Sequence, residues 1–533
     1  MVSFSDLRNA KPGELDTAWR SWRVLVERLE EAEDAYRTRL LGGVRNSRWQ
    51  GRDAEAAMRT LVPVQERIRV SATEASAVAS VLDTAGRRFR IAQLKLDSAI
   101  SEAEAAYLKV GDDGSLAFPD ALPPRFATWD EYKLTAYRVH GKMKIALDEA
   151  TKADTEIAAA LHGLDAGILD RRDPLAELRK DAGTATRLAG FKPGDIPPKG
   201  KKTPAEIAQW WRSLPEEQRH LLMNAYPSKI GWLNGIPSED RDEANRTDLQ
   251  SRIADIEAKG GPRTDDERRL VNLQRALDLY DKGGTDKNHT VAPRDVYLLG
   301  LRNDGDGQAI VAFGNPDTSP HTSVYVPGTG DDLNKVSGIL RRNERLWAQS
   351  QEYAHGQVAS IMWLGYDPPD TIPKAALPLY AENGAPAFDG FVDGLRQAQG
   401  DAGTHSHVTV VGHSYGTRLT GEAASHGDGL KVDDMVAVGS PGMGVTSVRH
   451  LHIDQRHFWS ESAPGDLVSY GAPVLGSHGA VPGDGRFGGN MMTTDTEGHS
   501  GYWDLGSVSL QNQARVVVGD YGRVGFESGR PPS

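Results

Sequence analysis

The sequence predicts an α/β protein in which a mostly parallel sheet with helices on both faces follows an all-α bundle. Three observations lead to this prediction. The first 165 residues carry apolar residues at helical spacing. From about residue 291, short apolar strands alternate with helical segments. A valine-rich strand, Val408-Thr-Val-Val411, then leads into a glycine-flanked turn and a helix. Strands that alternate with helices favour a parallel sheet, because parallel neighbours need a crossover connection.

The composition limits the size, partners and location of the protein. The chain has 533 residues, which is too long for one core and predicts two to four domains. The net charge of -12 without a basic stripe argues against nucleic-acid partners and anionic lipid surfaces. The absence of cysteine excludes disulfides, zinc-thiolate sites and thiol catalysis. We find no ordinary signal peptide and no transmembrane segment, so we expect a cytoplasmic protein or one exported without a cleavable signal.

Three long amphipathic helices are expected in the N-terminal third. The first has a four-three stripe that we expect to end at Gly42-Gly43, and the second has a seven-residue repeat with a bend near Pro63. The third keeps the four-three rhythm over residues 129–164. The stripe of the first helix is Leu15, Trp19, Trp22, Val26, Leu29, Tyr36 and Leu40, broken once at Glu33, and the repeat of the second is Leu61, Ile68, Ala75, Leu82, Phe89, Leu96 and Ala103. We assign residues 1–112 to a helical hairpin and 113–190 to a long helix that continues the bundle.

The first two helices are joined at Trp49-Gln50-Gly51. This arrangement resembles the WXG-motif family, the helical-hairpin substrates of type VII secretion. The resemblance implies a helical partner and export by that route, with Trp49 packed at the hairpin tip. The family's Tyr-x-x-x-Asp/Glu export element is absent after the second helix, where Tyr107 is followed by Gly111. A hairpin that only packs on its neighbours is the other interpretation.

A linker and a helical segment separate the bundle from the sheet domain. Residues 191–204 are rich in proline, glycine and lysine, as linkers are. Thr203-Pro204-Ala205-Glu206 then starts a helix, with Thr203 as the cap. Residues 205–290 include Trp210-Trp211 and the run Ile230-Gly-Trp-Leu-Asn-Gly-Ile-Pro237. This segment is either a cap over a site or a packing module under the sheet.

Residues 291–525 form the predicted sheet domain. Two strands, 296–301 and 309–313, flank Asn303-Asp-Gly-Asp-Gly307, which we interpret as a hairpin turn and not as a calcium loop. Further strands are expected at 323–326, 361–364, 408–411, 435–438 and 457–462, and helices at 332–353, 388–399 and 504–517.

The turn Gly412-His413-Ser414-Tyr415-Gly416 fits G-x-S-x-G between a strand and a helix. That context indicates a nucleophile elbow, which exposes the serine hydroxyl in a strained turn. The strand pattern and this turn together are typical of the α/β-hydrolase fold. From Thr203 to Gly519 the chain also resembles a family of actinobacterial α/β-hydrolases of unassigned substrate, which carry the Trp-Trp helix and the Ile-Gly-x-Leu-x-Gly-Ile-Pro segment.

A serine nucleophile needs a base and an acid, which follow it in the order acid then histidine in this fold. Asp466 is the favoured acid, because it follows a strand after a short turn. His499 is the favoured base, because it precedes the last helix, and His478 is second. The other candidates are the acids Asp454, Asp484 and Asp495 and the histidines His426, His450, His452 and His457. The family resemblance supports both choices through its Gly-Asp and His-Ser-x-Tyr patterns.

An oxyanion hole needs two backbone amides. One is expected from Tyr415, and the other from Thr329, with Gly328 as the alternative, in the loop Val326-Pro-Gly-Thr-Gly330. The glycine-rich run 471–489 is expected to be a mobile loop over the site. His450, His452, His457 and Asp454 lack familiar ligand spacing, so we predict no metal, and nothing implies a cofactor.

These patterns predict a serine hydrolase that cleaves an ester or related acyl bond of a small-molecule or lipid-like substrate. The alternative is an exported interaction or effector protein in which the hydrolase fold is mainly a scaffold.

Overall fold

The computed structural model describes residues 1–45, 51–164, 174–200, 202–286, 289–471 and 478–527. The chain forms two compact units that are not contiguous in sequence. Unit 1 comprises Met1–Tyr36, Val64–Asp195 and Pro215–Ala225. Unit 2 comprises Arg37–Pro63, Ile196–Leu214 and Tyr226–Ser533. The predicted linker 191–204 therefore contains a boundary between the units, after Asp195.

Unit 1 is built from helices, as its apolar spacing predicts. They are α1 (Phe4–Asn9), α2 (Pro12–Ala35), most of α4 (Arg52–Ala105), α5 (Trp129–Gly163), α6 (Pro174–Leu188) and α8 (Glu216–Ala225). A two-stranded hairpin, β1 (Lys109–Val110) with β2 (Leu116–Ala117), follows α4. The described residues contain no helix that is long and apolar enough to cross a membrane.

Helix α5 confirms the predicted stripe. Its buried residues are Tyr132, Ala136, Val139, Met143, Ala146, Ala150, Ala153, Ile157 and Ala160, all on the four-three rhythm. Thr128 caps the helix by accepting a hydrogen bond from the Glu131 amide. Because most of these residues are alanine, neighbouring helices approach closely, and Ala153 and Ile157 pack with Ala77 and Val81 of α4. The small side chains therefore set the spacing of the bundle.

The prediction that Gly42-Gly43 ends the first helix is wrong. After α2 the chain makes a π-helical turn, Tyr36–Leu41, and then continues as α3 (Gly42–Arg45). Neither glycine adopts the positive φ that ends a helix. The π-helical turn rotates the residues that follow it, so the stripe loses its phase just after the break at Glu33 and Leu40 is exposed. Trp49 and Gln50 lie outside the described residues.

Helix α4 continues through Pro63, where the boundary between the two units falls. Beyond it, the repeat positions Ala75, Leu96 and Ala103 are buried, while Ile68 and Leu82 are half-buried. The heptad pattern is therefore a better predictor of burial in the unit 1 core near the end of α4 than near its start.

The segment 205–290 contains three further helices of unit 2 besides α7 (Pro204–Ser213). They are α9 (Pro227–Ile230), α10 (Ser238–Lys259) and α11 (Asp265–Lys282), followed by β3 (Gly284–Asp286) and β4 (His289–Val291). The Asn245 amide of α10 donates to the Leu298 carbonyl (2.9 Å), and Asp242 accepts from the Leu298 amide (2.5 Å). Side chains of α10 thus satisfy the backbone of an edge strand, as a packing module does.

Unit 2 contains an eight-stranded sheet in the order β12-β11-β10-β9-β7-β8-β6-β5. The strands are β5 (Val296–Arg302), β6 (Gln308–Phe313), β7 (His321–Val326), β8 (Val358–Leu364), β9 (His407–His413), β10 (Asp434–Val438), β11 (Phe458–Glu461) and β12 (Asn490–Met491). Strand β6 runs antiparallel to β5 and β8, and the other pairs are parallel. The predicted turn joins β5 to β6 with positive φ at Gly305 and Gly307.

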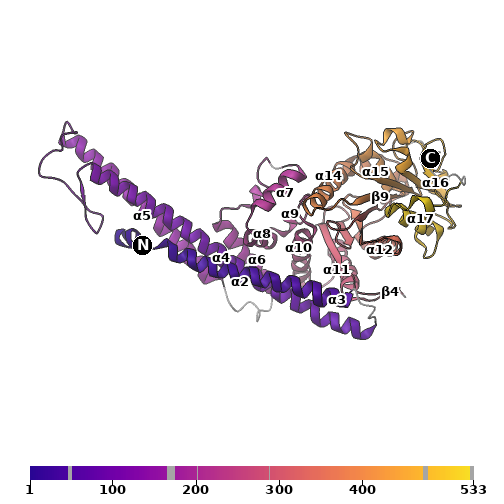
Figure 1. The fold of residues 1–533 in the computed structure, drawn as a ribbon, viewed down its shortest axis with the longest axis horizontal. Coiled ribbons are helices and arrows are strands. Elements are labelled where there is room, and N and C mark those ends of the chain that lie inside the picture. Colours follow the sequence, from indigo (N-terminus) through magenta and orange to yellow (C-terminus); the bar gives the residue numbers. More distant parts are fainter. Residues whose placement is uncertain (46–50, 165–173, 201, 287–288, 472–477, 528–533) are drawn as a thin grey trace. The chain divides into compact units, whose positions relative to one another are not determined.

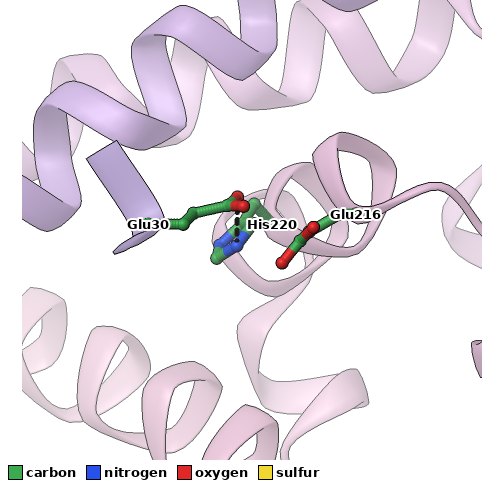
Figure 2. Close-up of side chains that lie close together, drawn as sticks. All are labelled: Glu30, Glu216 and His220. Atoms are coloured by element: carbon green, nitrogen blue, oxygen red, sulfur yellow. Dashed lines mark ion pairs between the residues drawn. The ribbon is translucent and has the colours of Figure 1, made fainter. Parts of the chain in front are cut away.

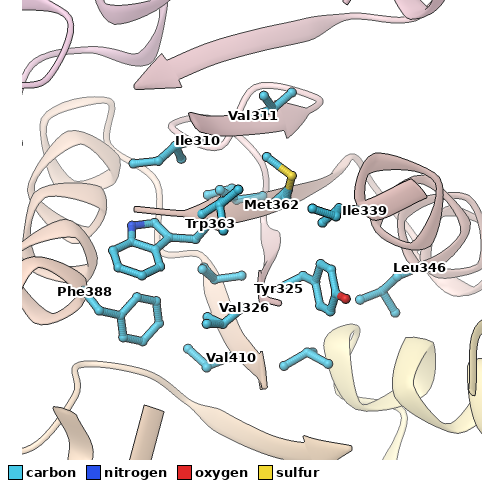
Figure 3. Packing of buried hydrophobic residues seen from close by; sticks show 14 of the residues in the cluster. Ile310, Val311, Tyr325, Val326, Ile339, Leu346, Met362, Trp363, Phe388 and Val410 are labelled. Carbon is cyan, nitrogen blue, oxygen red and sulfur yellow. The ribbon is translucent and has the colours of Figure 1, made fainter. Parts of the chain in front are cut away.

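Helices cover both faces of this sheet (Figure 1). One face carries α12 (Val336–Tyr353) and α17 (Val508–Val517), which pack on each other. The other carries α14 (Leu379–Asp401) and α15 (Tyr415–Ala424), which also pack together. Figure 3 shows how β8 serves both layers, since Met362 points toward α12 and Trp363 toward α14. The Trp363 ring meets Phe388 edge to face at 4.8 Å, a contact worth about 1 kcal/mol beyond burial.

Candidate active site

Ser414 is the one residue between the end of β9 and the start of α15. Its backbone has φ 54° and ψ -127°, a conformation that costs roughly 1–3 kcal/mol for a residue with a side chain. A Cβ added at Gly412 would lie 3.0 Å from Thr417 Cα, and one at Gly416 would lie 2.2 Å from the Val326 carbonyl oxygen. Position 416 therefore requires glycine, because a backbone oxygen occupies the space of a side chain, and position 412 leaves little room for one.

The turn lies at the point where the strand order reverses. From β7 the chain crosses to β8 on one side, and β9 then returns to the other side of β7. The loops that follow β7 and β9 therefore diverge at neighbouring strand ends, where open α/β sheets bind ligands. The β7 loop lies directly against Ser414. A Cβ added at Gly328 would be 2.7 Å from Ser414 Cβ and 3.0 Å from the Tyr415 nitrogen.

Two backbone amides of this region are available to a ligand. Tyr415 is the first residue of α15, so its amide has no partner within the helix. The Thr329 amide makes no hydrogen bond within the described part of the chain. The Gly328 amide, by contrast, donates to Asp331 (3.3 Å). This contact favours Thr329 over Gly328 as the second donor.

Buried polar groups hold the β7 loop in place. The Tyr366 hydroxyl donates to the Pro327 carbonyl at 2.8 Å. Asp331, which is buried, accepts from Arg342 at 3.2 Å, and burial raises the pKa of its carboxyl. Arg342 also donates to the Tyr325 hydroxyl on β7. The backbone of the loop is thereby tied to the sheet and to α12.

Asp466 and His499 lie in hydrogen-bond contact, with Asp466 Oδ1 2.9 Å from His499 Nδ1. Asp466 is fully buried, and its other oxygen accepts from the Tyr502 hydroxyl (2.6 Å) and from Ser469 Oγ (3.1 Å). Burial alone would raise the pKa of Asp466, but the hydrogen bonds from His499 and Tyr502 outweigh it and lower the pKa below its usual range. Asp466 is therefore an anion whose charge faces His499.

His413 supports the backbone of His499, a contact that the sequence did not predict. Its Nε2 lies 3.0 Å from the His499 carbonyl oxygen, and the two rings lie 4.7 Å apart. Burial, followed by the charges of His499 and Arg342, lowers the pKa of His413 well below its usual range. A neutral His413 with its proton on Nε2 can donate this hydrogen bond.

Gly439 is a second residue that sequence reasoning missed. It has φ 56°, and an added Cβ would lie 2.9 Å from Asp466 Oδ2 and 3.2 Å from His499 Nδ1. The glycine at the end of β10 thus leaves room for the acid and the base to meet. A glycine directly after a buried strand was the available signal.

The remaining candidates contact other groups. Asp454 and Asp484 pair with Arg456 and Arg486, and Asp495 accepts from the Val508 amide. His457 contacts Asp434, at the start of β10, and His426 lies beside Glu422. His478 is buried with its ring edge-on to Tyr415. The three alternative acids therefore bind groups other than His499.

In the described part of the predicted mobile glycine-rich loop, 471–489, backbone hydrogen bonds connect the run to the segment after β10. The Gly444 amide donates to the His478 carbonyl (2.7 Å), the Ala480 amide to Val445 (2.9 Å) and the Val448 amide to Phe487 (3.0 Å). Phe487 is buried against Phe458. This backbone pairing anchors residues 478–487 to the segment after β10. Residues 472–477 lie outside the described part.

The eight-stranded, mostly parallel sheet with helices on both faces is the α/β-hydrolase fold. Residues 303–476 match the family described as alpha/beta hydrolase. The uncharacterized protein Rv2079 of Mycobacterium tuberculosis is 30% identical over 490 residues, which cover 79% of this chain and 72% of that protein. The chain therefore belongs to the same alpha/beta hydrolase family as this mycobacterial protein.

Two further similarities accompany this relationship. The uncharacterized protein Rv0963c of Mycobacterium tuberculosis is 31% identical over 187 residues, which cover 33% of this chain and 68% of that protein. The crystal structure of a novel thermostable esterase from Pseudomonas putida is 10% identical, with coverage of 51% of this chain and 92% of that chain and a TM-score of 0.24.

Proposed function

We propose that this chain is a serine hydrolase that cleaves a carboxylic ester or related acyl bond through Ser414, His499 and Asp466. The observation that carries the proposal is the contact between buried Asp466 and His499. Ser414 occupies its strained turn at the carboxyl end of the central strand β9. The order of these residues in the chain, serine then acid then histidine, is the order of α/β-hydrolases.

In the proposed reaction, Ser414 Oγ attacks the carbonyl carbon while His499 Nε2 accepts the hydroxyl proton. Asp466 accepts the hydrogen bond from His499 Nδ1, which sets the tautomer and stabilises the imidazolium. The same proton then passes to the leaving alkoxide, and an acyl-enzyme remains. Water, deprotonated by His499, attacks the acyl carbon and releases the acid and free Ser414.

In this proposal the amides of Tyr415 and Thr329 donate hydrogen bonds to the carbonyl oxygen as negative charge develops on it. Each such donor contributes about 3 kcal/mol to lowering the barrier. The Tyr366 and Asp331 contacts keep the β7 loop fixed, so the amides need little reorganisation during the reaction.

Active-site labelling tests this proposal. The purified full chain should react with a fluorophosphonate probe, and peptide mapping should place the label on the peptide that contains Ser414. The variant Ser414→Ala should lose both labelling and hydrolysis of a chromogenic short-chain ester. Ser425→Ala, at the end of α15, is the matched control and should retain both, since its hydroxyl contacts only the Glu422 carbonyl and His426. Wild-type protein that neither labels nor hydrolyses such esters contradicts the proposal.

A further inference from the structure

A group of metal-ligating side chains lies in unit 1, whereas the candidate active site belongs to unit 2. It consists of Glu30 on α2 and of Glu216 and His220 on α8 (Figure 2). One ligand atom of each residue lies within 4.8 Å of the other two. Among the described residues, no other group of three or more histidine and acidic side chains brings its ligand atoms this close together.

The spacing of the two α8 residues suits a shared ligand. Glu216 and His220 are four positions apart, so both side chains project from one face of the helix. Paired ligands at this spacing are how a single helix contributes two donors to a metal ion. Glu30 approaches from a helix far away in the sequence, and Figure 2 shows its carboxylate paired with His220, with the Glu216 carboxylate nearby.

The contact between Glu30 and His220 is short but is not a well-directed hydrogen bond. Glu30 Oε1 lies 2.8 Å from His220 Nε2, yet among the described residues this buried oxygen has no partner with hydrogen-bond geometry. Two ligands of one ion point their lone pairs at the ion and not at each other. At metal–ligand distances of about 2.0–2.2 Å, neighbouring donor atoms lie roughly 3 Å apart.

Two carboxylates also face each other in this group. Burial, then the contact with Glu30, raises the pKa of the Glu216 carboxyl. The Glu30 side chain is only 15% exposed, so water screens the repulsion incompletely on the Glu30 side. Either a proton or a cation between the carboxylates would relieve it.

We propose that Glu30, Glu216 and His220 bind a divalent transition-metal ion that links α2 to α8 within unit 1. Imidazole nitrogen selects Zn²⁺ and similar ions over Mg²⁺ and Ca²⁺, and glutamate oxygens complete a ligand set of one nitrogen and two carboxylates. Glu216 is exposed, so water can fill the remaining coordination position. The ion offsets the two carboxylate charges and stabilises the helix pair.

Zinc titration of the full chain tests this proposal. Untagged protein, stripped with EDTA and dialysed, should bind one equivalent of Zn²⁺ in isothermal titration calorimetry and should unfold at a temperature several degrees higher when Zn²⁺ is in large excess over its Kd. Mg²⁺ should produce neither effect. Co²⁺ at the site should show visible absorption bands that report nitrogen and oxygen ligands.

Substitutions at the ligands should weaken this binding. Glu216→Gln and His220→Gln should each lower zinc affinity at least about 10-fold, as should Glu30→Gln. Glu31→Gln is the matched control, because it makes the same charge change at an exposed residue of α2 outside the group. Glu216 is the exposed member, so Glu216→Gln keeps the test decisive if a variant at a less exposed ligand fails to fold.

Three results would overturn the metal site. The first is wild-type protein that binds no zinc. The second is zinc binding of equal affinity in Glu216→Gln and wild type, which would place the ion on other histidines of the 15 in the chain. The third is an unfolding temperature that responds to Glu216→Gln and to pH but not to zinc, which would identify a proton shared between the carboxylates.

Discussion

Gly328 offers the sharpest test of the proposed oxyanion site. In Gly328→Ala, the new methyl group would lie 2.7 Å from the His413 carbonyl oxygen, 2.7 Å from Ser414 Cβ and 3.0 Å from the Tyr415 nitrogen. Comfortable carbon contacts are about 3.5–4.0 Å, so the β7 loop and the serine turn must separate by roughly 1 Å. The atoms in the way are mostly backbone, which cannot move aside as a flexible side chain would.

A displacement of this size should reduce kcat/KM for a p-nitrophenyl ester by about 10²–10³-fold. A misplacement of about 1 Å lowers the rate roughly 10²-fold. Loss of one oxyanion donor raises the barrier by about 3 kcal/mol, which is also a rate loss of about 10²-fold, so the two estimates agree. The loss should appear mainly in kcat, because the amides bind the charge that develops in the transition state.

Gly338→Ala is the matched control, since a Cβ at Gly338 in α12 has no atom within 4 Å. This control should keep full activity and gain stability, because alanine is the better helix former. Circular dichroism and the unfolding temperature distinguish a displaced loop from a misfolded protein. A folded Gly328→Ala variant with activity within twofold of wild type would refute the placement of the β7 loop in the reaction.

Three further predictions follow from buried groups of unit 2. Tyr502→Phe removes the hydroxyl that donates to Asp466 (2.6 Å), so kcat should fall roughly 10-fold with little change in KM. The folded-state pKa of Asp466 is lowered, so its ionised form stabilises the fold above the unfolded-state value of about 3.9. The difference in unfolding temperature between wild type and Asp466→Asn should therefore be largest near neutral pH and should shrink as the pH falls below about 4. Burial raises the pKa of Glu461, so the folded protein holds this proton more tightly than the unfolded chain does. Glu461→Gln should therefore unfold at a higher temperature than wild type at pH 7, with the gap narrowing toward pH 4, and an equal or lower temperature at pH 7 would contradict this expectation.

The sequence predicted the sheet elements well, because their signals are local. Runs of valine, isoleucine and alanine at 309–313 and 408–411 lie in strands that the structure also contains. The turn with Ser414 combines an apolar strand, two glycines and a helical run in one short stretch. These signals are consecutive in the sequence, so the motif is readable from it, although the Val326 carbonyl that excludes a side chain at Gly416 comes from β7.

The predictions failed where a residue's environment comes from elsewhere in the chain. Gly42 and Gly43 have the composition of a helix end, but the chain continues as a helix after a π-helical turn. The composition of the glycine-rich run likewise gives no sign that residues 478–487 pair with backbone after β10. Composition reports local preference, and tertiary contacts override it.

The sequence by itself determined the α/β class, the long helices of the bundle and the chemical identity of the candidate serine, acid and histidine. Only the tertiary structure decided which groups meet. It brought Asp466 to His499, placed Gly328 against Ser414 and left the Gly328 amide bound to Asp331. It also joined Glu30 to His220. Periodicity and motifs are encoded in neighbouring residues, whereas distances between remote side chains depend on how strands and helices pack.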